Sequence, residues 1–245
     1  MDNWFGFWKH YYALKKDPTI GDFSAIFRNG MTAIVPKALM SAFDEVFLRE
    51  VYNNNITSFS ENLLIIDIGA NVGYFTLYIL DKQPNAHIVA YEPLPSNILL
   101  LEQHKAINKI NNLIIDKRAV HGTAKDITIN YNDSIDYSVG ASILNRDKAT
   151  GSITIPAVSI PDIFIENKIT TCDLLKVDCE GAEYNIIFNC PDEYFEKINN
   201  IVIEVHDWVP KEEGTPAQLI KFLEEKNYTV NFIKNEILWC HRINN

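Results

Sequence analysis

A glycine-containing turn follows an apolar run of strand length, and it is the part of the sequence best suited to binding a ligand. The run Leu63–Ile66 leads into Asp67, and two glycines four residues apart, Gly69 and Gly73, precede an apolar helix-like segment. A strand that turns through glycines into a helix presents backbone N–H groups and the positive helix end to a ligand. Glycine also permits turns that a Cβ would block. This arrangement predicts a nucleotide-type binding site.

The residues of the turn exclude two phosphate-binding motifs. A dinucleotide fingerprint needs glycine at the position of Asn71, and a P-loop needs Lys and Ser or Thr after Gly73, where aromatic residues stand instead. A second carboxylate, Glu92, lies 19 residues after Gly73 at the end of the next predicted strand, where it can bind both hydroxyls of a ribose. A glycine turn without phosphate contacts and a ribose carboxylate suit S-adenosylmethionine as the cofactor.

Four further polar residues follow two later predicted strands. Asp178 and Glu180 leave one strand, and Glu204 and His206 lie two apart on the other and therefore share a face. Ligands of open α/β sheets bind beyond the carboxyl ends of the strands, so these residues are expected near the glycine turn. An imidazole at this position can accept a proton, and neighbouring carboxylates would orient it and raise its pKa. We predict that His206 is the catalytic base, supported by Asp178, Glu180 and Glu204.

The same four residues are also possible metal ligands. Carboxylates with one histidine suit Mg²⁺, Mn²⁺ or Fe²⁺, but no closely spaced ligand pair fixes a coordination geometry, so we predict a site without a metal. Cys179 lies between Asp178 and Glu180, and these carboxylates disfavour a thiolate. We therefore interpret Cys179 as a packing residue.

The composition is that of a globular protein, with 47% hydrophobic and 22% charged residues in a chain of 245. The net charge of −10 and the lack of Lys/Arg runs longer than two argue against binding to nucleic acid. The four cysteines show no C-x-x-C spacing, which is typical of free thiols in a reducing cytosol. No apolar stretch approaches the roughly 18 residues of a membrane span, and no signal peptide opens the chain. We expect a cytoplasmic protein without an integral membrane segment.

The N-terminal segment is strongly aromatic and also basic. Trp4, Phe5 and Trp8 are among six aromatic residues within the first 12 positions, and lysines are interleaved with them. Such a segment can form a helix that lies in a membrane interface. The alternative is a helix that packs on the domain or on a second subunit, which would make the protein a homo-oligomer. The acidic net charge would oppose binding to anionic lipid, so it favours packing on protein.

Hydrophobic periodicity and turn residues predict the order of the elements. Asn29-Gly30 is typical of a two-residue hairpin turn within residues 22–35, and a helix is expected over 44–52. Ser96, Ser159 and Thr215 are expected to cap helices. The other strands are expected at residues 63–66, 87–92, 113–120, 127–131, 152–155, 173–178, 200–206, 228–233 and 237–242, and the other helices from residue 74 and at 96–107, 181–189 and 216–226.

Strands that alternate with helices predict an α/β fold with a doubly wound, mostly parallel sheet. The last two strands, separated by three polar residues, are expected to add an antiparallel strand at the C-terminus. We divide the chain into an N-terminal extension of helix, hairpin and helix (residues 1–60) and a cofactor-binding domain (residues 61–245).

Several blocks of the sequence resemble the FkbM family of S-adenosylmethionine-dependent methyltransferases. The combination of four blocks, at Ile65–Thr76, Glu92-Pro93, Asp173–Glu183 and Glu204–His206, is specific, although the block at Ile65–Thr76 alone is shared by many methyltransferases. The resemblance covers roughly Phe23 to Ile243. The blocks are I-x-D-I-G-A-N-x-G-x-x-T at Ile65–Thr76, E-P at Glu92-Pro93, D-x-L-K-x-D-x-E-G-A-E at Asp173–Glu183, and E-x-H at Glu204–His206.

The resemblance implies a class I, Rossmann-like methyltransferase fold and O-methylation of a small-molecule or glycan hydroxyl, often on a sugar. We expect Asp67, Gly69, Asn71, Gly73 and Thr76 to shape the methionine end of the cofactor pocket and Glu92 to hold the ribose, with Asp178 as a further cofactor-binding residue. One position departs from the pattern of this class, where an acidic or amide side chain that contacts adenine often follows the third strand. Here Arg118 precedes Ala119, with Asp116 two residues earlier.

Two other functions are compatible with a glycine turn. A non-catalytic cofactor-binding or partner subunit of a biosynthetic complex would keep the turn but would not need the carboxylates and His206, which this chain retains. A nicotinamide dehydrogenase is disfavoured by Asn71.

Overall fold

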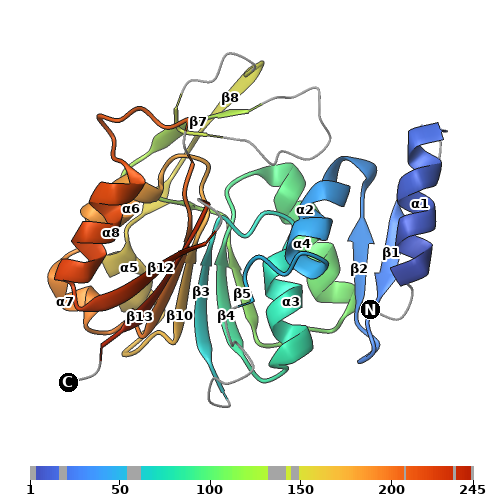
Figure 1. Ribbon diagram of the computed structural model, residues 1–245, viewed down its shortest axis with the longest axis horizontal. Coiled ribbons are helices and arrows are strands. Elements are labelled where there is room, and N and C mark those ends of the chain that lie inside the picture. Colours follow the sequence, from blue (N-terminus) through green and yellow to red (C-terminus); the bar gives the residue numbers. More distant parts are fainter. Residues whose placement is uncertain are drawn as a thin grey trace.

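The computed structural model describes residues 4–16, 21–53, 62–131, 142–144, 149–206, 208–233 and 236–243. At its centre is a seven-stranded sheet in the order β12-β13-β11-β10-β3-β4-β5 (Figure 1). The strands are β3 (Leu64–Ile68), β4 (His87–Tyr91), β5 (Leu113–Asp116), β10 (Leu174–Val177), β11 (Asn200–Glu204), β12 (Tyr228–Ile233) and β13 (Ile237–Arg242).

The sheet is mostly parallel, as the sequence predicts. Strand β3 pairs in parallel with β4 on one side and with β10 on the other, and β13 is antiparallel to both β11 and β12. The chain therefore builds the sheet outward from β3 in one direction and then returns to its other side. Such a reversal leaves a crevice at the carboxyl ends of the two central strands, which is where open α/β sheets bind ligands.

Helices cover both faces of the sheet (Figure 1). One group lies beside β3 to β5 and the other beside β10 to β13. Alternate strand residues enter two hydrophobic clusters, so that Ile65 and Leu174 belong to one, and Ile66 and Leu175 to the other. The first group is α2 (Met40–Phe47), α3 (Tyr74–Lys82) and α4 (Pro95–Ile107), and the second is α5 (Ile160–Glu166), α6 (Glu183–Phe188), α7 (Asp192–Phe195) and α8 (Pro216–Glu225).

The N-terminal extension differs in detail from the sequence prediction. It contains α1 (Trp4–Lys16), β1 (Phe23–Ile26), β2 (Thr32–Val35), the 3₁₀ helix η1 (Lys37–Leu39) and α2. The hairpin forms, but its loop is longer than two residues, and of Asn29 and Gly30 only the glycine has a positive φ. Helix α2 begins and ends earlier than the predicted 44–52. Glu50 adopts a φ of 46°, which a right-handed helix does not allow.

Helix α1 packs on the protein through one face. The Phe7 side chain is fully buried, with its ring centroid 5.3 Å from that of Phe43 and 5.7 Å from that of Phe23. The opposite face exposes Phe5 and Tyr12. Phe7 and Phe43 belong to the same hydrophobic cluster as residues of β3, α3 and α4, so the extension shares the core of the sheet. Among the described residues, no helix is long and apolar enough to cross a membrane.

Two further differences concern the predicted strand 113–120 and one helix start. The strand is interrupted, because after β5 the residues of β6 (Ala119–Val120) leave the sheet and pair with β9 (Ala157–Val158).

Helix α4 has Leu94 at its N-cap and Pro95 in its first turn, so Ser96 lies inside the helix. The caps at Ser159 and Thr215 form as predicted. The predicted strands 127–131 and 152–155, which lie between β6 and β9 in the sequence, form the antiparallel pair of β7 (Ile127–Tyr131) and β8 (Gly151–Ile155).

A buried histidine ties the extension to the glycine turn. His104 of α4 contacts the carbonyl oxygen of Val72 through Nδ1 (2.8 Å), and Nε2 accepts a hydrogen bond from the Ile34 N–H (2.8 Å). Because Nε2 accepts, this pattern assigns the proton of the neutral ring to Nδ1. Burial lowers the pKa of His104, although the hydrogen bond to the Val72 carbonyl acts against it.

Protonation of His104 should destabilise the fold at acidic pH. The folded protein holds the neutral ring, so stability from this site is complete above pH 6.5, the usual pKa in an unfolded chain. It is lost as the pH falls through the lower pKa of the folded state. Urea unfolding at about pH 8 and about pH 5.5 should therefore differ less in His104→Gln than in wild type.

At about pH 8 the variant itself should lose about 1–3 kcal/mol, because a buried backbone group is left without its partner. An equal pH effect on the free energy of unfolding in both proteins would contradict the assignment to His104.

Candidate active site

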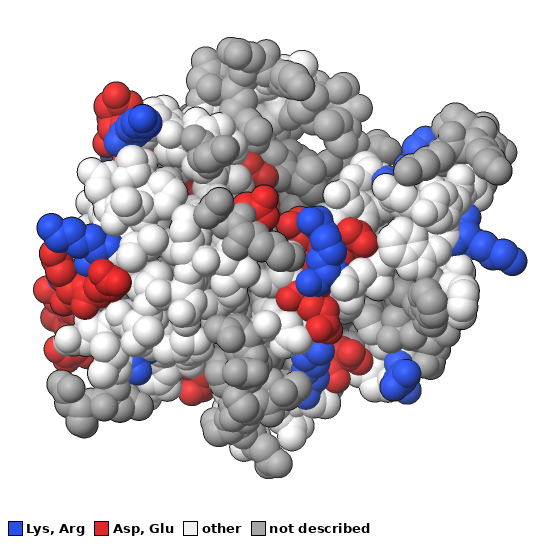
Figure 2. Space-filling view, in the orientation of Figure 1, with Lys and Arg blue, Asp and Glu red and all other residues white. Residues whose placement is uncertain are grey.

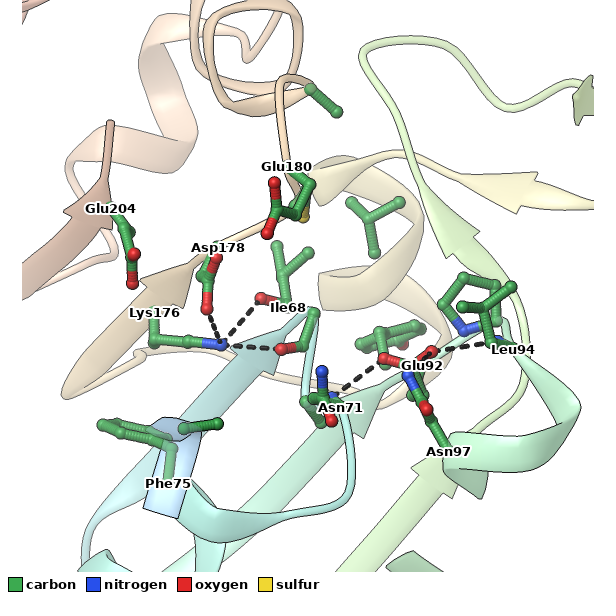
Figure 3. A pocket seen from close by; sticks show the side chains of 18 of the residues that line it. Ile68, Asn71, Phe75, Glu92, Leu94, Asn97, Lys176, Asp178, Glu180 and Glu204 are labelled. Atoms are coloured by element: carbon green, nitrogen blue, oxygen red, sulfur yellow. Dashed lines mark hydrogen bonds and ion pairs between the residues drawn. The ribbon is translucent and has the colours of Figure 1, made fainter. Parts of the chain in front are cut away.

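A cavity of 340 Å³ opens at the carboxyl ends of β3, β4, β10 and β11. Its walls come from the turns after these strands, from α2 and from the β7–β8 region, so elements far apart in sequence meet there (Figure 3). Acidic side chains are visible in the hollow of this face of the molecule, near its centre (Figure 2). Among the predicted site residues that line the cavity are Gly69, Asn71, Glu92, Asp178, Glu180 and Glu204.

The two glycines of the turn allow close packing within the protein. Gly69 has a φ of +75°, and a Cβ on it would lie 1.8 Å from the carbonyl oxygen of Asp178. Gly73 has a φ of +89°, and a Cβ on it would meet the Leu101 side chain at 2.4 Å. Any other residue at Gly69 would push the glycine turn away from β10. The first glycine therefore sets the distance between the two central strand ends.

Glu92 is a buried carboxylate that organises the turn from the neighbouring strand. It accepts hydrogen bonds from the backbone N–H of Asn71 (2.8 Å) and of Leu94 (2.9 Å), and from the Asn97 side chain (3.3 Å). Burial raises its pKa to about 7, against the lowering effect of these donors. A carboxylate has about four acceptor positions, and three donors already bind Glu92, so about one position remains for a hydroxyl group of a ligand.

A buried lysine joins the two central strands. The ammonium of Lys176 lies 3.3 Å from a carboxylate oxygen of Asp67. It also lies 3.3 Å from a carboxylate oxygen of Asp178 (Figure 3), and it donates to the Gly69 carbonyl at 2.7 Å. Burial lowers the pKa of Lys176, but the two carboxylates outweigh this effect and raise it. Thr76 donates to the other oxygen of Asp67 at 3.0 Å. Lys176 therefore stays charged beneath the cavity.

The residues predicted to bind the cofactor fall into two groups. Gly69, Asn71, Glu92 and Asp178 line the cavity. Asp67 and Thr76 are buried beneath it, where they position Lys176 and the turn, and Gly73 packs against α4. These last three are not among the lining residues in the described part of the chain.

The predicted catalytic carboxylates lie together at one end of the cavity. In Figure 3, Asp178, Glu180 and Glu204 lie together above Lys176, and Glu92 lies apart from them. The charge of Asp178 and burial raise the pKa of Glu204 to about 8. This end of the site therefore concentrates acceptor groups, of which Glu204 titrates close to neutral pH.

His206 lies beside this cluster, between Glu180 and Glu183. Its Nδ1 is 3.2 Å from a carboxylate oxygen of Glu183, and its Nε2 is 3.6 Å from one of Glu180. Burial lowers the pKa of His206, but contacts with Glu183, Asp178 and Glu180 outweigh it and raise the pKa to about 9. The ring is therefore protonated at neutral pH, and it is not among the described residues that line the cavity.

Glu183, which the sequence analysis does not assign to the site, fixes the turn before α6. Its buried carboxylate accepts hydrogen bonds from the N–H groups of Cys179 (2.8 Å) and Gly181 (2.9 Å). Burial raises the pKa of the Cys179 thiol well above its usual range, which agrees with a packing role.

One group in the described part of the chain has the spacing of metal ligands. Asp178, Glu204 and His206 each offer an atom, and these atoms lie within 4.8 Å of one another. The Lys176 ammonium already contacts Asp178, and a cation bound there would be repelled by it. Tyr52 already donates to Glu204 at 2.6 Å. These contacts favour a site that works without a metal.

Lys176 and Tyr52 are two further residues of the site that sequence patterns did not identify. Lys176 carries a signal, because it is the one charged residue within the otherwise apolar strand β10. Tyr52 follows α2 in a segment without a recognisable motif, and its contact with Glu204 spans 152 residues. At the position that departs from the class I pattern, Arg118 forms ion pairs with Asp116 and Glu166.

Comparison with known proteins connects this geometry to a family. The sequence profile of the methyltransferase FkbM domain matches residues 67–230. Methyltransferase 1 of Beauveria bassiana (strain ARSEF 2860) is 24% identical over 205 residues, which cover 76% of this chain and 79% of that protein. The 31-O-demethyl-FK506 methyltransferase FkbM of Streptomyces tacrolimicus is 22% identical over 214 residues, which cover 77% of this chain and 81% of that protein.

A solved structure of magnesium protoporphyrin IX methyltransferase (ChlM) from Synechocystis PCC 6803 with bound SAM is also similar. It has a TM-score of 0.43 and 12% sequence identity, and the match covers 98% of this chain and 91% of that one.

Replacement of Lys176 by methionine should destabilise the protein by about 3–5 kcal/mol, because it leaves Asp67 as an uncompensated buried carboxylate. Urea unfolding would measure this loss. Lys221→Met is a matched control on the surface of α8, where the exposed pair with Glu225 contributes at most about 1 kcal/mol.

Addition of Asp67→Asn to Lys176→Met should restore part of the lost stability, because the neutral amide no longer needs a counter-charge. Strictly additive losses in the double variant would contradict the proposed dependence of Asp67 on Lys176.

Proposed function

We propose an acceptor class and residue roles for this chain, which belongs to the methyltransferase FkbM family. The family match makes it an S-adenosylmethionine-dependent methyltransferase. When bound, this cofactor supplies an electrophilic methyl group on a positively charged sulfur. The proposal concerns the atom that receives the methyl group and the residues that prepare it.

The cavity residues fit the cofactor along its length. The turn of Gly69 and Asn71 forms one wall, and the Glu92 carboxylate can accept a hydrogen bond from a ribose hydroxyl. Beyond Glu92 the lining is apolar, with Leu94, Val120 and Ile129, which suits the faces of an adenine ring. In this arrangement the adenine lies against the β6–β7 region, away from Arg118.

The acceptor is an uncharged compound with a hydroxyl group, and a sugar hydroxyl suits the site best. The observation that carries this proposal is the cluster of Asp178, Glu180 and Glu204 at the end of the cavity away from Glu92. Ionised carboxylates only accept hydrogen bonds, so they bind hydroxyl donors well and repel an anionic acceptor. Glu45 of α2 adds a fourth carboxyl group to the same wall.

Transfer to oxygen requires an in-line approach and removal of the hydroxyl proton. We assign proton removal to the group formed by Asp178, Glu180, Glu204 and His206. His206 is protonated at neutral pH in this structure, so as a base it would first have to lose that proton. Its charge holds Glu180 and Glu183 in place at the edge of the site.

Glu92→Gln should weaken binding of S-adenosylhomocysteine by about 10- to 100-fold, because hydrogen bonds to a charged group are worth about 1.5–3 kcal/mol. Calorimetry at about pH 8 would measure this, since the pKa of Glu92 is about 7 and the wild-type carboxylate is then ionised. Glu166→Gln, a change in the surface pair with Arg118, is the control and should bind normally. Binding of NAD without any binding of S-adenosylhomocysteine would overturn the cofactor assignment.

Methyl transfer to a neutral sugar should exceed transfer to its acidic counterpart by at least about tenfold, because a carboxylate next to the acidic wall is repelled. The probes are matched pairs of methyl hexopyranosides and methyl hexopyranosiduronic acids, tested with labelled S-adenosylmethionine. Transfer to the uronic acids alone would contradict the neutral acceptor. Addition of a chelator should leave the rate unchanged, and recovery of a lost rate with Mg²⁺ or Mn²⁺ would show that the carboxylates bind a metal.

A further inference from the structure

A tyrosine from the N-terminal extension reaches into the acidic end of the cavity. The Tyr52 hydroxyl lies 2.6 Å from Oε2 of Glu204 and 3.4 Å from Oδ2 of Asp178. Its side chain is only 3% exposed, and its ring packs edge-to-face on Phe75 with centroids 5.3 Å apart. The phenol is therefore held in one position between two carboxylates.

Glu204 has one carboxylate oxygen available for a substrate. In the described part of the chain, Tyr52 is its hydrogen-bond donor, and it occupies Oε2. Glu204 lines the cavity, whereas His206 is not among the described residues that line it. A base must lie within hydrogen-bond reach of the proton that it removes, so position favours Glu204 over His206.

We propose that Glu204 accepts the proton of the acceptor hydroxyl and that Tyr52 is a positioning residue that holds its carboxylate. This inference rests on the O-methyltransferase function proposed above. As the acceptor oxygen bonds to the methyl carbon, the methyl–sulfur bond breaks and its electron pair remains on sulfur. The O–H bond breaks, and its proton moves to Glu204. Charge and atoms then balance, with an ether and a thioether as products.

The groups around Glu204 give it a suitable proton affinity. Asp178 at the end of β10 and Glu45 of α2 raise its pKa, while the phenol of Tyr52 and the charge of His206 lower it. The result, about 8, lies close to neutral pH, where a general base is most effective. His206, with a pKa of about 9, keeps its proton more strongly.

Three variants test the proposal with the methyl hexopyranoside that the wild type accepts. Glu204→Gln should reduce the rate of methyl transfer by about 10²- to 10⁴-fold, the usual effect of losing a general base. Tyr52→Phe should shift the rise of rate with pH to higher pH, because the ionised form of Glu204 loses a hydrogen bond. Tyr228→Phe also removes a buried hydroxyl, which here donates to the carbonyls of Phe195 and Ile198, and it should leave the pH profile unchanged.

A second measurement needs no acceptor. With ¹³C-labelled glutamate, the carboxyl resonance that disappears in Glu204→Gln should titrate at higher pH in Tyr52→Phe than in wild type. S-adenosylhomocysteine should bind both variants about as tightly as wild type, which shows that the fold and the cofactor site are intact. A wild-type protein that methylates no hydroxyl probe would refute the proposed function. The titration tests separately whether the hydrogen bond from Tyr52 lowers the pKa of Glu204.

Two outcomes would overturn the inference. One is methyl transfer by Glu204→Gln within a few-fold of wild type, combined with a large loss in His206→Asn. The other is an unchanged titration midpoint and pH profile in Tyr52→Phe.

Discussion

The buried ammonium of Lys176 is the interaction on which the rest of the site depends. In the register of the sheet, Lys176 of β10 lies directly beside Asp67 of β3, so the ion pair joins the two central strands side by side. The same ammonium binds the Gly69 carbonyl and contacts Asp178. One charge therefore fixes the glycine turn and the first acidic residue of the cavity relative to each other. The positive charge of Lys176 is tolerated at this depth because carboxylates on both sides balance it.

The chemical nature of the cavity lining differs on the two sides of Lys176. The glycine turn and Glu92 present backbone and carboxylate acceptors, and the lining beyond them is apolar. On the other side, Asp178, Glu180 and Glu204 lie so close together that their charges affect one another, and the pKa of Glu204 rises to about 8. A positively charged sulfur would relieve part of this repulsion. The electrostatics of the acidic end therefore suit a cationic methyl donor and an uncharged acceptor.

The N-terminal extension contributes to the site as well as to the core. Phe7 and Phe43 pack in the same cluster as β3 and α3, and His104 connects the hairpin to the glycine turn. This packing places α2 along the cavity and brings Tyr52 to Glu204. The boundary at residue 60 separates two parts of the sequence that share one hydrophobic core.

The sequence by itself determined the order of strands and helices, the mostly parallel sheet, and the meeting of Asp178, Glu180 and Glu204 with the glycine turn. Hydrophobic periodicity and glycine positions act over a few residues, and strand ends of a parallel sheet meet at one edge, so these features are readable locally. Helix limits were less readable, as the early end of α2 shows. Only the tertiary structure decided that Asp67 and Thr76 lie beneath the cavity, that His206 is held protonated between Glu180 and Glu183, and that Tyr52 completes the acidic end. These facts depend on strand register and on contacts between separate elements, of which the contact of Tyr52 with Glu204 spans 152 residues, and no local pattern encodes them.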